Sequence, residues 1–201
     1  MDDTHVSSHL TIEPEQIFGG YQISKFAGKG RWSKVWLGAN ESQQVAIKVY
    51  RAGDDNTEEF LNEIKIYNMF KRECSARELN SHHIIDYIGS FVHIAYDSMF
   101  NARLHPCVVF CQGSDTLSSF VKYCKKTYES AIPTHIVKVI MRQVMQGLAT
   151  LHACNIIHAD IKPSNVLLQS PIDESTDNIS ILIADLGGSV INTGDNFDTI
   201  G

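Results

Sequence analysis

Apolar and polar residues alternate along the first half of the chain with the two-residue period of β-strands. Three such stretches, joined by short turns, predict strands over residues 21–27, 33–38 and 45–50. Two more apolar runs predict strands over 82–91 and 106–110, and we expect the polar stretch between them to be a surface loop. The pattern therefore predicts an antiparallel sheet.

The spacing changes to the 3.6-residue period of helices at three places. One predicted helix contains Phe60 and Tyr67, one begins after a cap at Ser114 or Asp115, and the longest spans residues 134–152. The longest is apolar on more than one face, so we expect it to have neighbours on several sides.

Short apolar runs and polar stretches make up the rest of the chain. Residues 156–157 and 166–168 predict buried strands, and the loop between them is expected to be the rigid crest of a hairpin. A last strand is predicted over 181–184, after a polar loop at 170–180. Residues 1–16 are polar and aperiodic, which predicts a flexible leader.

Composition and charge narrow the class of protein. The chain has 201 residues, and its 43% hydrophobic content is enough for a packed core. A net charge of -6 argues against a general affinity for nucleic acid. No apolar run approaches the roughly 20 residues needed to cross a bilayer, and the acidic N-terminus is unlike a secretory signal. The five cysteines include no CxxC pair, which favours free thiols. Free thiols indicate a reducing compartment, so we expect the protein in the cytoplasm, in the nucleus or in both.

The segment at 158–165 carries the most informative chemistry. Asp160, Lys162 and Asn165 lie between two apolar runs, with the spacing of a phosphoryl-transfer loop. Asp160 could accept a hydroxyl proton, Lys162 could steady the migrating phosphate, and Asn165 could hold a metal ion. Asp185 opens the loop after the last predicted strand, from where its carboxylate could bind Mg²⁺.

Two features earlier in the chain are suited to phosphate binding. Gly28 and Gly30 lie in a predicted hairpin turn, where the backbone can approach phosphates closely. Lys48 lies in an apolar strand, and a buried ammonium group needs an anionic partner. Glu58, Glu59 and Glu73 are also near, but we prefer Glu63 as that partner, because it lies at the edge of the apolar stripe of its helix. Walker and dinucleotide-binding loops are excluded, since neither Gly-Lys-Ser/Thr nor a helix pattern follows the glycines.

Four motifs in the same order resemble those of eukaryotic serine/threonine protein kinases. They are the glycine-rich segment 28–35, the strand 45–48, the catalytic loop 158–165 and the triplet 185–187. The resemblance covers residues 17–201. It implies an α+β fold with a β-rich N-lobe that carries one major helix, and a partial, mainly α-helical C-lobe. The implied divisions are the leader at 1–16, an N-lobe at 17–110, a hinge at 111–114 and a partial C-lobe at 115–201.

The resemblance assigns a role to each candidate residue, with ATP and Mg²⁺ as the cofactors. Asp160 and Lys162 are the catalytic pair, while Asn165 and Asp185 are the metal ligands. The implied ATP-binding residues are Gly28, Lys29, Gly30, Val35, Ala46, Lys48, Glu63, Phe110, Cys111, Gly113 and Leu167. The family pattern continues beyond Gly201, so we expect the chain to stop within the activation segment and to transfer phosphate poorly by itself.

Departures from the common kinase pattern point to a subfamily. Ala159 stands where many kinases have an arginine that docks an activation-segment phosphate, so we expect no such docking. This substitution, together with Leu186 in the metal-binding triplet and the sequence before Phe110, resembles the kinases of arginine/serine-rich splicing factors. The expected partner is therefore a basic or arginine/serine-rich protein, with no direct binding of nucleic acid or membrane.

Two alternative functions remain open from the sequence. One is a truncated, non-catalytic nucleotide-binding or scaffolding module. The other is a small-molecule phosphotransferase, which Lys162 and Pro163 argue against. A zinc site at His82, His83 or His152 is excluded, because no second ligand lies at a suitable spacing.

Overall fold

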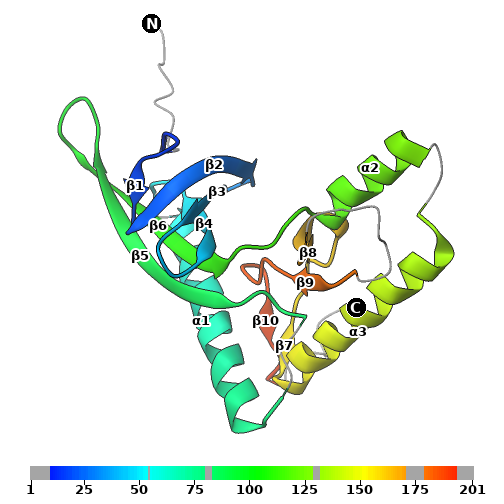
Figure 1. The fold of residues 1–201 in the computed structure, drawn as a ribbon. Helices are drawn as coiled ribbons and strands as arrows, with labels where there is room; N and C mark the ends of the chain where they lie inside the picture. Colours follow the sequence, from blue (N-terminus) through cyan, green and yellow to red (C-terminus); the bar gives the residue numbers. More distant parts are fainter. Residues whose placement is uncertain (1–9, 54, 80–82, 129–131, 171–178, 194–201) are drawn as a thin grey trace, which may run out of the picture. The chain divides into compact units, whose positions relative to one another are not determined.

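A computed structural model describes residues 10–53, 55–79, 83–128, 132–170 and 179–193 (Figure 1). The chain divides into two compact units, each described by itself. The first unit comprises Met1–Ile64 and Asp86–Gln112, and the second comprises Lys65–Ile85 and Gly113–Gly201. Both helices and strands are present, which confirms the predicted α+β class.

A six-stranded antiparallel sheet forms most of the first unit, as the alternating pattern predicts. Its strand order is β1-β2-β3-β4-β6-β5. The strands are β1 (Ile17–Phe18), β2 (Tyr21–Lys29), β3 (Ser33–Ala39), β4 (Gln44–Tyr50), β5 (Tyr87–Tyr96) and β6 (Ala102–Cys111). Apolar side chains on one face form a core that contains Ile12, Phe18, Ile23, Trp36, Val45, Ile47, Val49, Cys107 and Val109.

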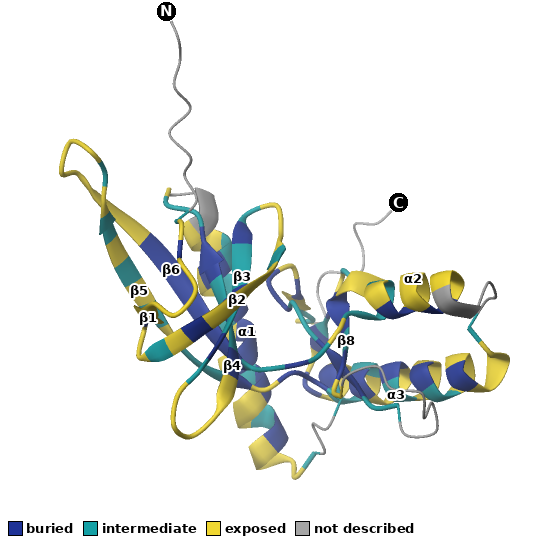
Figure 2. Cartoon of the chain, turned by 45° about the horizontal axis from the view of Figure 1, so that its top comes forward, coloured by how far each residue is buried: buried dark blue, intermediate teal, exposed yellow. Residues whose placement is uncertain are grey.

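The ends of the first unit's strands differ from the sequence-based expectation. β5 and β6 pair as far as Tyr96 and Ala102, so most of the expected surface loop is a β-hairpin. Asp97 closes the turn, because its Oδ1 accepts the backbone N–H groups of Met99 and Asn101, both at 2.9 Å. The end of this hairpin is largely exposed (Figure 2), and exposed strands give a weaker hydrophobic pattern than buried ones.

Part of the predicted leader packs against the sheet. Residues 1–9 lie outside the described residues, but Ile12 is buried in the core of the first unit. The backbone N–H of Glu15 donates to the carbonyl oxygen of Ile23 at 2.7 Å, and Ile23 N–H donates to Gln16 at 2.9 Å. The part of this unit that packs on the sheet therefore includes residues before Ile17.

Helix α1 (Asp55–Ala76) continues from the first unit into the second. Within the first unit, its Phe60 ring packs edge-on against Tyr50, with ring centroids 5.8 Å apart. Glu63 follows one turn later on the same helix face and is fully buried. The burial of Phe60 and Glu63 fixes this end of the helix on strand β4.

The second unit contains α2 (Leu117–Tyr128) and α3 (Thr134–Ala153), followed by four short strands. The strands are β7 (Ile156–Ile157), β8 (Val166–Leu168), β9 (Ile181–Ile183) and β10 (Val190–Ile191). β7 pairs with β10, and β8 pairs with β9. The expected hairpin between residues 156–157 and 166–168 was therefore wrong, since each of these strands pairs with a strand from later in the chain.

The two long helices of the second unit follow their predicted positions. The cap of α2 is Thr116 instead of Ser114 or Asp115, because Thr116 Oγ1 accepts the N–H of Ser119 at 3.1 Å. The buried side of α3 is made of Ile136, Ile140, Val144, Gly147 and Leu151.

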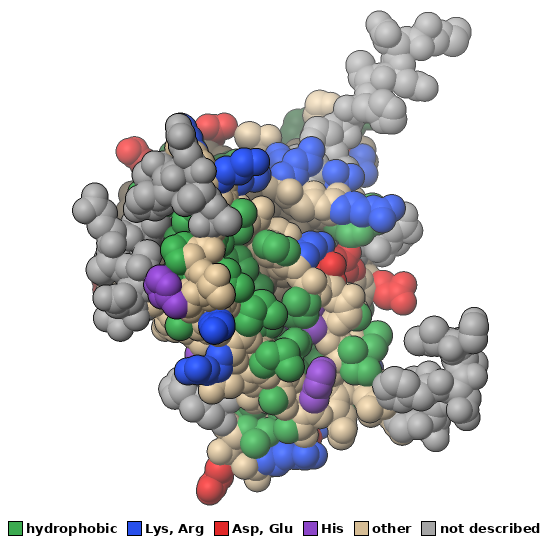
Figure 3. All heavy atoms as spheres, turned by 90° about the vertical axis from the view of Figure 1, so that its right-hand side faces the viewer, with side chains coloured by type: hydrophobic (Ala, Val, Ile, Leu, Met, Phe, Trp, Pro, Cys, Tyr) green, Lys and Arg blue, Asp and Glu red, His purple; other side chains and the backbone are tan. Residues whose placement is uncertain are grey.

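Apolar side chains also lie on the outside of α3. Val137, Met141 and Met145 are exposed on this helix. Hydrophobic side chains gather across the middle of the face in Figure 3, the side on which α2 and α3 lie. No helix within the described part of the chain is long and apolar enough to span a membrane. All five cysteines are free thiols, and Cys111 is the least buried of them.

Candidate active site

The loop between β7 and β8 holds the predicted catalytic residues. Its two ends are fixed because β7 and β8 each pair with a later strand. A short 3-10 turn, Pro163–Asn165, leads back into β8, and proline suits the first position of such a turn. Ala159 has a φ angle of 62°, a conformation that costs a residue with a side chain about 1–2 kcal/mol. This strained residue directly precedes Asp160.

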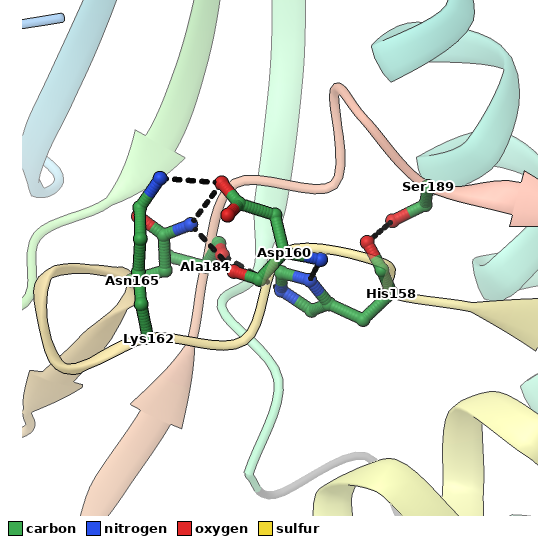
Figure 4. A network of polar contacts seen from close by, with 6 residues as sticks. All are labelled: His158, Asp160, Lys162, Asn165, Ala184 and Ser189. Atoms are coloured by element: carbon green, nitrogen blue, oxygen red, sulfur yellow. Dashed lines mark hydrogen bonds and ion pairs between the residues drawn. The ribbon is translucent and has the colours of Figure 1, made fainter.

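Lys162 and Asn165 converge on one oxygen of Asp160 (Figure 4). Lys162 Nζ lies 2.6 Å from Asp160 Oδ2, and Asn165 Nδ2 donates to the same oxygen at 3.0 Å. Asn165 Nδ2 also donates to the backbone oxygen of Asp160 at 2.9 Å. Neither contact to the carboxylate uses Oδ1, so this oxygen remains available to accept a proton from a hydroxyl group.

The charges of this cluster favour an ionised carboxylate beside an ammonium group. The hydrogen bond from Lys162 lowers the pKa of Asp160, with a smaller lowering from Asn165. The same contact raises the pKa of Lys162, and the negative charge of Asp185 adds to this increase. Asp160 is therefore ionised at neutral pH, as a proton acceptor must be.

His158 connects the loop between β7 and β8 to the residue that precedes Asp185. The backbone N–H of Asp160 donates to His158 Nδ1 at 3.3 Å, which makes Nδ1 an acceptor. Nε2 then carries the proton and donates to the carbonyl oxygen of Ala184 at 3.1 Å. Ser189 Oγ donates to the backbone oxygen of His158 at 3.2 Å. Sequence reasoning gave no role to His158 or Ser189, because their partners lie 26 and 31 residues away along the chain.

Oxygen atoms of Asn165 and Asp185 are suited to Mg²⁺. Both hydrogen bonds of Asn165 to Asp160 use Nδ2, which leaves the carbonyl oxygen Oδ1 as a possible metal ligand. The N–H of Ala184 donates to the backbone oxygen of Asn165 at 2.9 Å and so places Asp185 beside the loop. The described residues contain no group of three His, Cys, Asp or Glu side chains able to hold a metal. Mg²⁺ needs only one or two protein carboxylates and keeps several waters, so these residues fit that ion.

In the first unit, Lys48 forms an ion pair with the buried Glu63. Lys48 Nζ lies 3.1 Å from Glu63 Oε1, and the hydroxyl of Tyr50 donates to Oε2 at 2.5 Å. Glu73, another candidate partner, instead pairs with Arg72 and Arg77. The structure thus brings Lys48 together with the glutamate chosen from the helical pattern. The sequence pattern did not predict a role for Tyr50, because a tyrosine in an apolar strand is usually a core residue.

The other predicted ATP-binding residues of the first unit lie along its sheet. Val35 pairs with Lys48, and Ala46 pairs with Phe110, so these four side chains share one face. Gly28 and Lys29 end β2, and Gly30 N–H donates to Ser33 at 2.8 Å in the turn. A Cβ atom at Gly28 would meet no other atom within 4 Å, so packing does not require glycine there. Cys111 ends β6 beside Phe110.

In the second unit, Gly113 lies against Leu167. A Cβ atom at Gly113 would lie 2.9 Å from Leu167 Cδ1, so a larger residue here would require the Leu167 side chain to shift. Ser114 N–H donates to the carbonyl oxygen of Leu168 at 2.7 Å, which fixes the segment beside β8. The two residues predicted to bind adenine from this unit are therefore in contact.

Comparison with known proteins identifies the family. Residues 21–199 match the protein kinase domain. The chain is 34% identical over 152 residues to protein kinase dsk1 of Schizosaccharomyces pombe, a match that covers 74% of this chain and 26% of dsk1. It is 32% identical over 154 residues to SRSF protein kinase 3 of Homo sapiens, which covers 75% of this chain and 25% of that protein.

A third relative, misshapen-like kinase 1 of Rattus norvegicus, is 31% identical over 175 residues, covering 85% of this chain and 12% of the kinase. The chain belongs to the protein kinase domain family. It spans about a quarter of the length of dsk1 and SRSF protein kinase 3. The resemblance to kinases of arginine/serine-rich splicing factors is confirmed, because dsk1 and SRSF protein kinase 3 are among the relatives.

Proposed function

We propose that this chain acts as a serine/threonine protein kinase that transfers the γ-phosphoryl group of ATP to protein hydroxyl groups. The observation that carries the proposal is the convergence of Lys162 and Asn165 on Oδ2 of Asp160. It leaves an ionised carboxylate with its other oxygen, Oδ1, available to a substrate hydroxyl, in a chain of the protein kinase family.

Asp160 is the proposed catalytic base. As the hydroxyl oxygen of the substrate attacks the γ-phosphorus, Oδ1 accepts the hydroxyl proton. Lys162 lies beside the other carboxylate oxygen of Asp160, Oδ2, and carries a positive charge. It can therefore offset negative charge on the transferred phosphoryl group. Phosphoryl transfer depends chiefly on such placement of charge, because its transition state is loose.

The phosphate groups of ATP are assigned to the proposed metal ligands, to Lys48 and to the glycine-containing segment. Mg²⁺ held by Asn165 Oδ1 and the Asp185 carboxylate would neutralise phosphate charge. Lys48 would contact phosphate oxygens while Glu63 holds its ammonium group. The end of β2 at Gly28 and Lys29, with Gly30 in the turn that follows, is assigned to cover the phosphates.

The adenine ring is assigned to apolar residues and backbone groups. These are Val35, Ala46, Phe110, Cys111, Gly113 and Leu167. Val35 and Ala46 share the sheet face of Lys48, which supports the assignment.

The proposed substrates are basic or arginine/serine-rich proteins of the cytoplasm or nucleus. Lys162 and Pro163 after the catalytic aspartate resemble serine/threonine kinases. Kinases named for SRSF proteins are among the relatives. The net charge of -6 favours association with a basic substrate over an acidic one.

The test is transfer of label from γ-labelled ATP in the presence of Mg²⁺. Three peptides of equal length would be compared: an arginine/serine repeat, the same repeat with tyrosine for serine, and a serine repeat with glutamate for arginine. We expect a low level of label in the first peptide, and its loss in Asp160→Asn, which keeps the shape but removes the base. Undiminished transfer by Asp160→Asn would contradict the proposal.

A binding measurement separates the kinase from a non-catalytic module. Mg-ATP should raise the melting temperature of the chain, since a ligand that binds the folded state stabilises it. Binding that is lost in Asp185→Ala, without label in any peptide, would favour a nucleotide-binding module. Label in the tyrosine peptide alone would overturn the serine/threonine assignment.

A further inference from the structure

The carboxylate of Glu63 is held at both of its oxygens. Lys48 contacts Oε1 and the hydroxyl of Tyr50 donates to Oε2 at 2.5 Å. Glu63 and Tyr50 are each 0% exposed. A buried carboxylate is costly unless its oxygens have partners, so the two contacts are both needed to keep the charge in place.

Tyr50 is itself fixed in position. Its ring packs edge-on against Phe60, which lies one helical turn before Glu63. Its backbone oxygen accepts a hydrogen bond from Nδ1 of the buried His105 at 3.1 Å. Helix α1 and strand β6 therefore both hold the residue that contacts the carboxylate. A hydroxyl on such a fixed ring restricts how Glu63 can rotate.

The surrounding charges keep the Tyr50 hydroxyl a donor. Burial, reinforced by the negative charge of Glu63, raises the pKa of Tyr50 far above its usual range, so the group stays protonated. Lys48 Nζ also lies 5.1 Å from the centre of the Tyr50 ring, a distance suited to a cation–π contact. Tyr50 thus contacts both members of the ion pair: its hydroxyl interacts with Glu63 and with Lys48, and its ring also lies beside Lys48.

We propose that Tyr50 is a positioning residue for the phosphate-binding lysine. Its hydroxyl fixes the Glu63 carboxylate so that Oε1 stays on Lys48 before nucleotide binds. The inference rests on the proposed function only for the role of Lys48 toward ATP. All three side chains belong to the first unit, so the arrangement is complete within that unit.

The variant Tyr50→Phe isolates the hydroxyl. It keeps the ring, its packing on Phe60 and the face presented to Lys48, and it removes the hydroxyl together with its contacts to Glu63 and Lys48. The matched control is Tyr87→Phe, which also removes a hydroxyl in the first unit, one that donates to Ser90 at 3.2 Å. A general effect of losing a tyrosine hydroxyl would appear in both variants.

Two measurements on the full chain read the position of Lys48. The first is the rate at which a dilute acetylating reagent modifies Nζ, followed by peptide mass spectrometry without nucleotide. The Lys48 side chain is 11% exposed, so this reaction is slow but measurable. The second is the dissociation constant for Mg-ATP. In Tyr50→Phe we expect acetylation at least about threefold faster and Mg-ATP binding about five- to tenfold weaker. Tyr87→Phe should match the parent in both.

A double-variant comparison shows whether Tyr50 acts through Glu63. A Glu63→Gln chain has no carboxylate at position 63 for the Tyr50 hydroxyl to position. Adding Tyr50→Phe to this chain should therefore change the acetylation rate of Lys48 little. If Tyr50→Phe changes the acetylation rate as much in the Glu63→Gln chain as in the parent chain, the proposal is overturned. It is also overturned by parent-like acetylation in Tyr50→Phe, or by failure of Tyr50→Phe to fold when Tyr87→Phe folds, which would assign the hydroxyl to stability alone.

The two proposals fail in distinguishable ways. If the parent chain binds no Mg-ATP, the proposed function fails, while the acetylation rates still decide the role of Tyr50. If the parent binds Mg-ATP and Tyr50→Phe binds it equally well with an unchanged acetylation rate, the positioning role fails and the proposed function stands.

Discussion

Replacing Lys48 with methionine should destabilise the first unit through the charge left on Glu63. Glu63 is 0% exposed, and in this variant the hydroxyl of Tyr50 would still contact its carboxylate. Removing one member of a buried ion pair typically costs about 3–5 kcal/mol, since the other charge stays buried and uncompensated.

A second calculation bounds this cost. Glu63 can escape the penalty by taking up a proton, and an ordinary glutamate ionises near pH 4.3, so protonation at pH 7 costs about 3.7 kcal/mol. At pH 5 the same protonation costs about 1 kcal/mol. The loss of stability in Lys48→Met should therefore be about 3–4 kcal/mol at pH 7 and should shrink toward about 1 kcal/mol at pH 5.

Urea unfolding, monitored by tryptophan fluorescence, measures this loss of stability in the first unit. The chain has two tryptophans, Trp32 and Trp36, and both belong to the first unit. The control is Lys48→Met combined with Glu63→Gln, which removes both charges and keeps an acceptor for Tyr50. We expect the double variant to recover most of the stability and yet bind Mg-ATP no better than Lys48→Met.

Three results would refute the reasoning about the ion pair. The first is a change of less than about 0.5 kcal/mol in Lys48→Met at pH 7, which is the size expected for an exposed pair. The second is equal destabilisation at pH 7 and pH 5. The third is a double variant as unstable as the single variant, which would assign the effect to lost packing of the lysine side chain.

Three other positions give more local effects. Gly19→Ala should destabilise the first unit much more than Gly20→Ala: both have positive φ angles, 60° and 85°, but only at Gly19 would a Cβ atom overlap the Phe91 ring. Superimposable thermal melts of the two variants would contradict this. Burial lowers the pKa of His105, so the unfolded chain takes up a proton more readily, and stability present above about pH 6.5 is lost as the pH falls. His105→Gln should flatten that loss between pH 7 and 5.5 in urea titrations, and an unchanged slope would rule out His105 as its source. Thr116→Ala should destabilise the second unit by about 0.5–2 kcal/mol through the lost helix cap, whereas Thr116→Ser should retain most of the stability in far-ultraviolet melts.

The sequence by itself determined the secondary structure and the composition of the candidate site. Alternating residues specify β3 and β4, and the 3.6-residue spacing specifies α3, because these patterns depend only on near neighbours along the chain. Asp160, Lys162 and Asn165 lie within six residues of one another, so a single loop brings them together. Glu63 could be paired with Lys48 because a buried lysine needs an acid and the helical pattern selects one.

Only the tertiary structure decided which distant residues meet. β7 and β8 were expected to flank one hairpin, but they pair with β10 and β9, a choice that short apolar strands do not encode. The contact of His158 with Ala184 joins the loop between β7 and β8 to the segment of Asp185, across 26 residues. The bond from Tyr50 to Glu63 likewise needs a strand and a helix to pack. Periodicity tells which face of an element is buried, but the partner that buries it is set by how the whole chain folds.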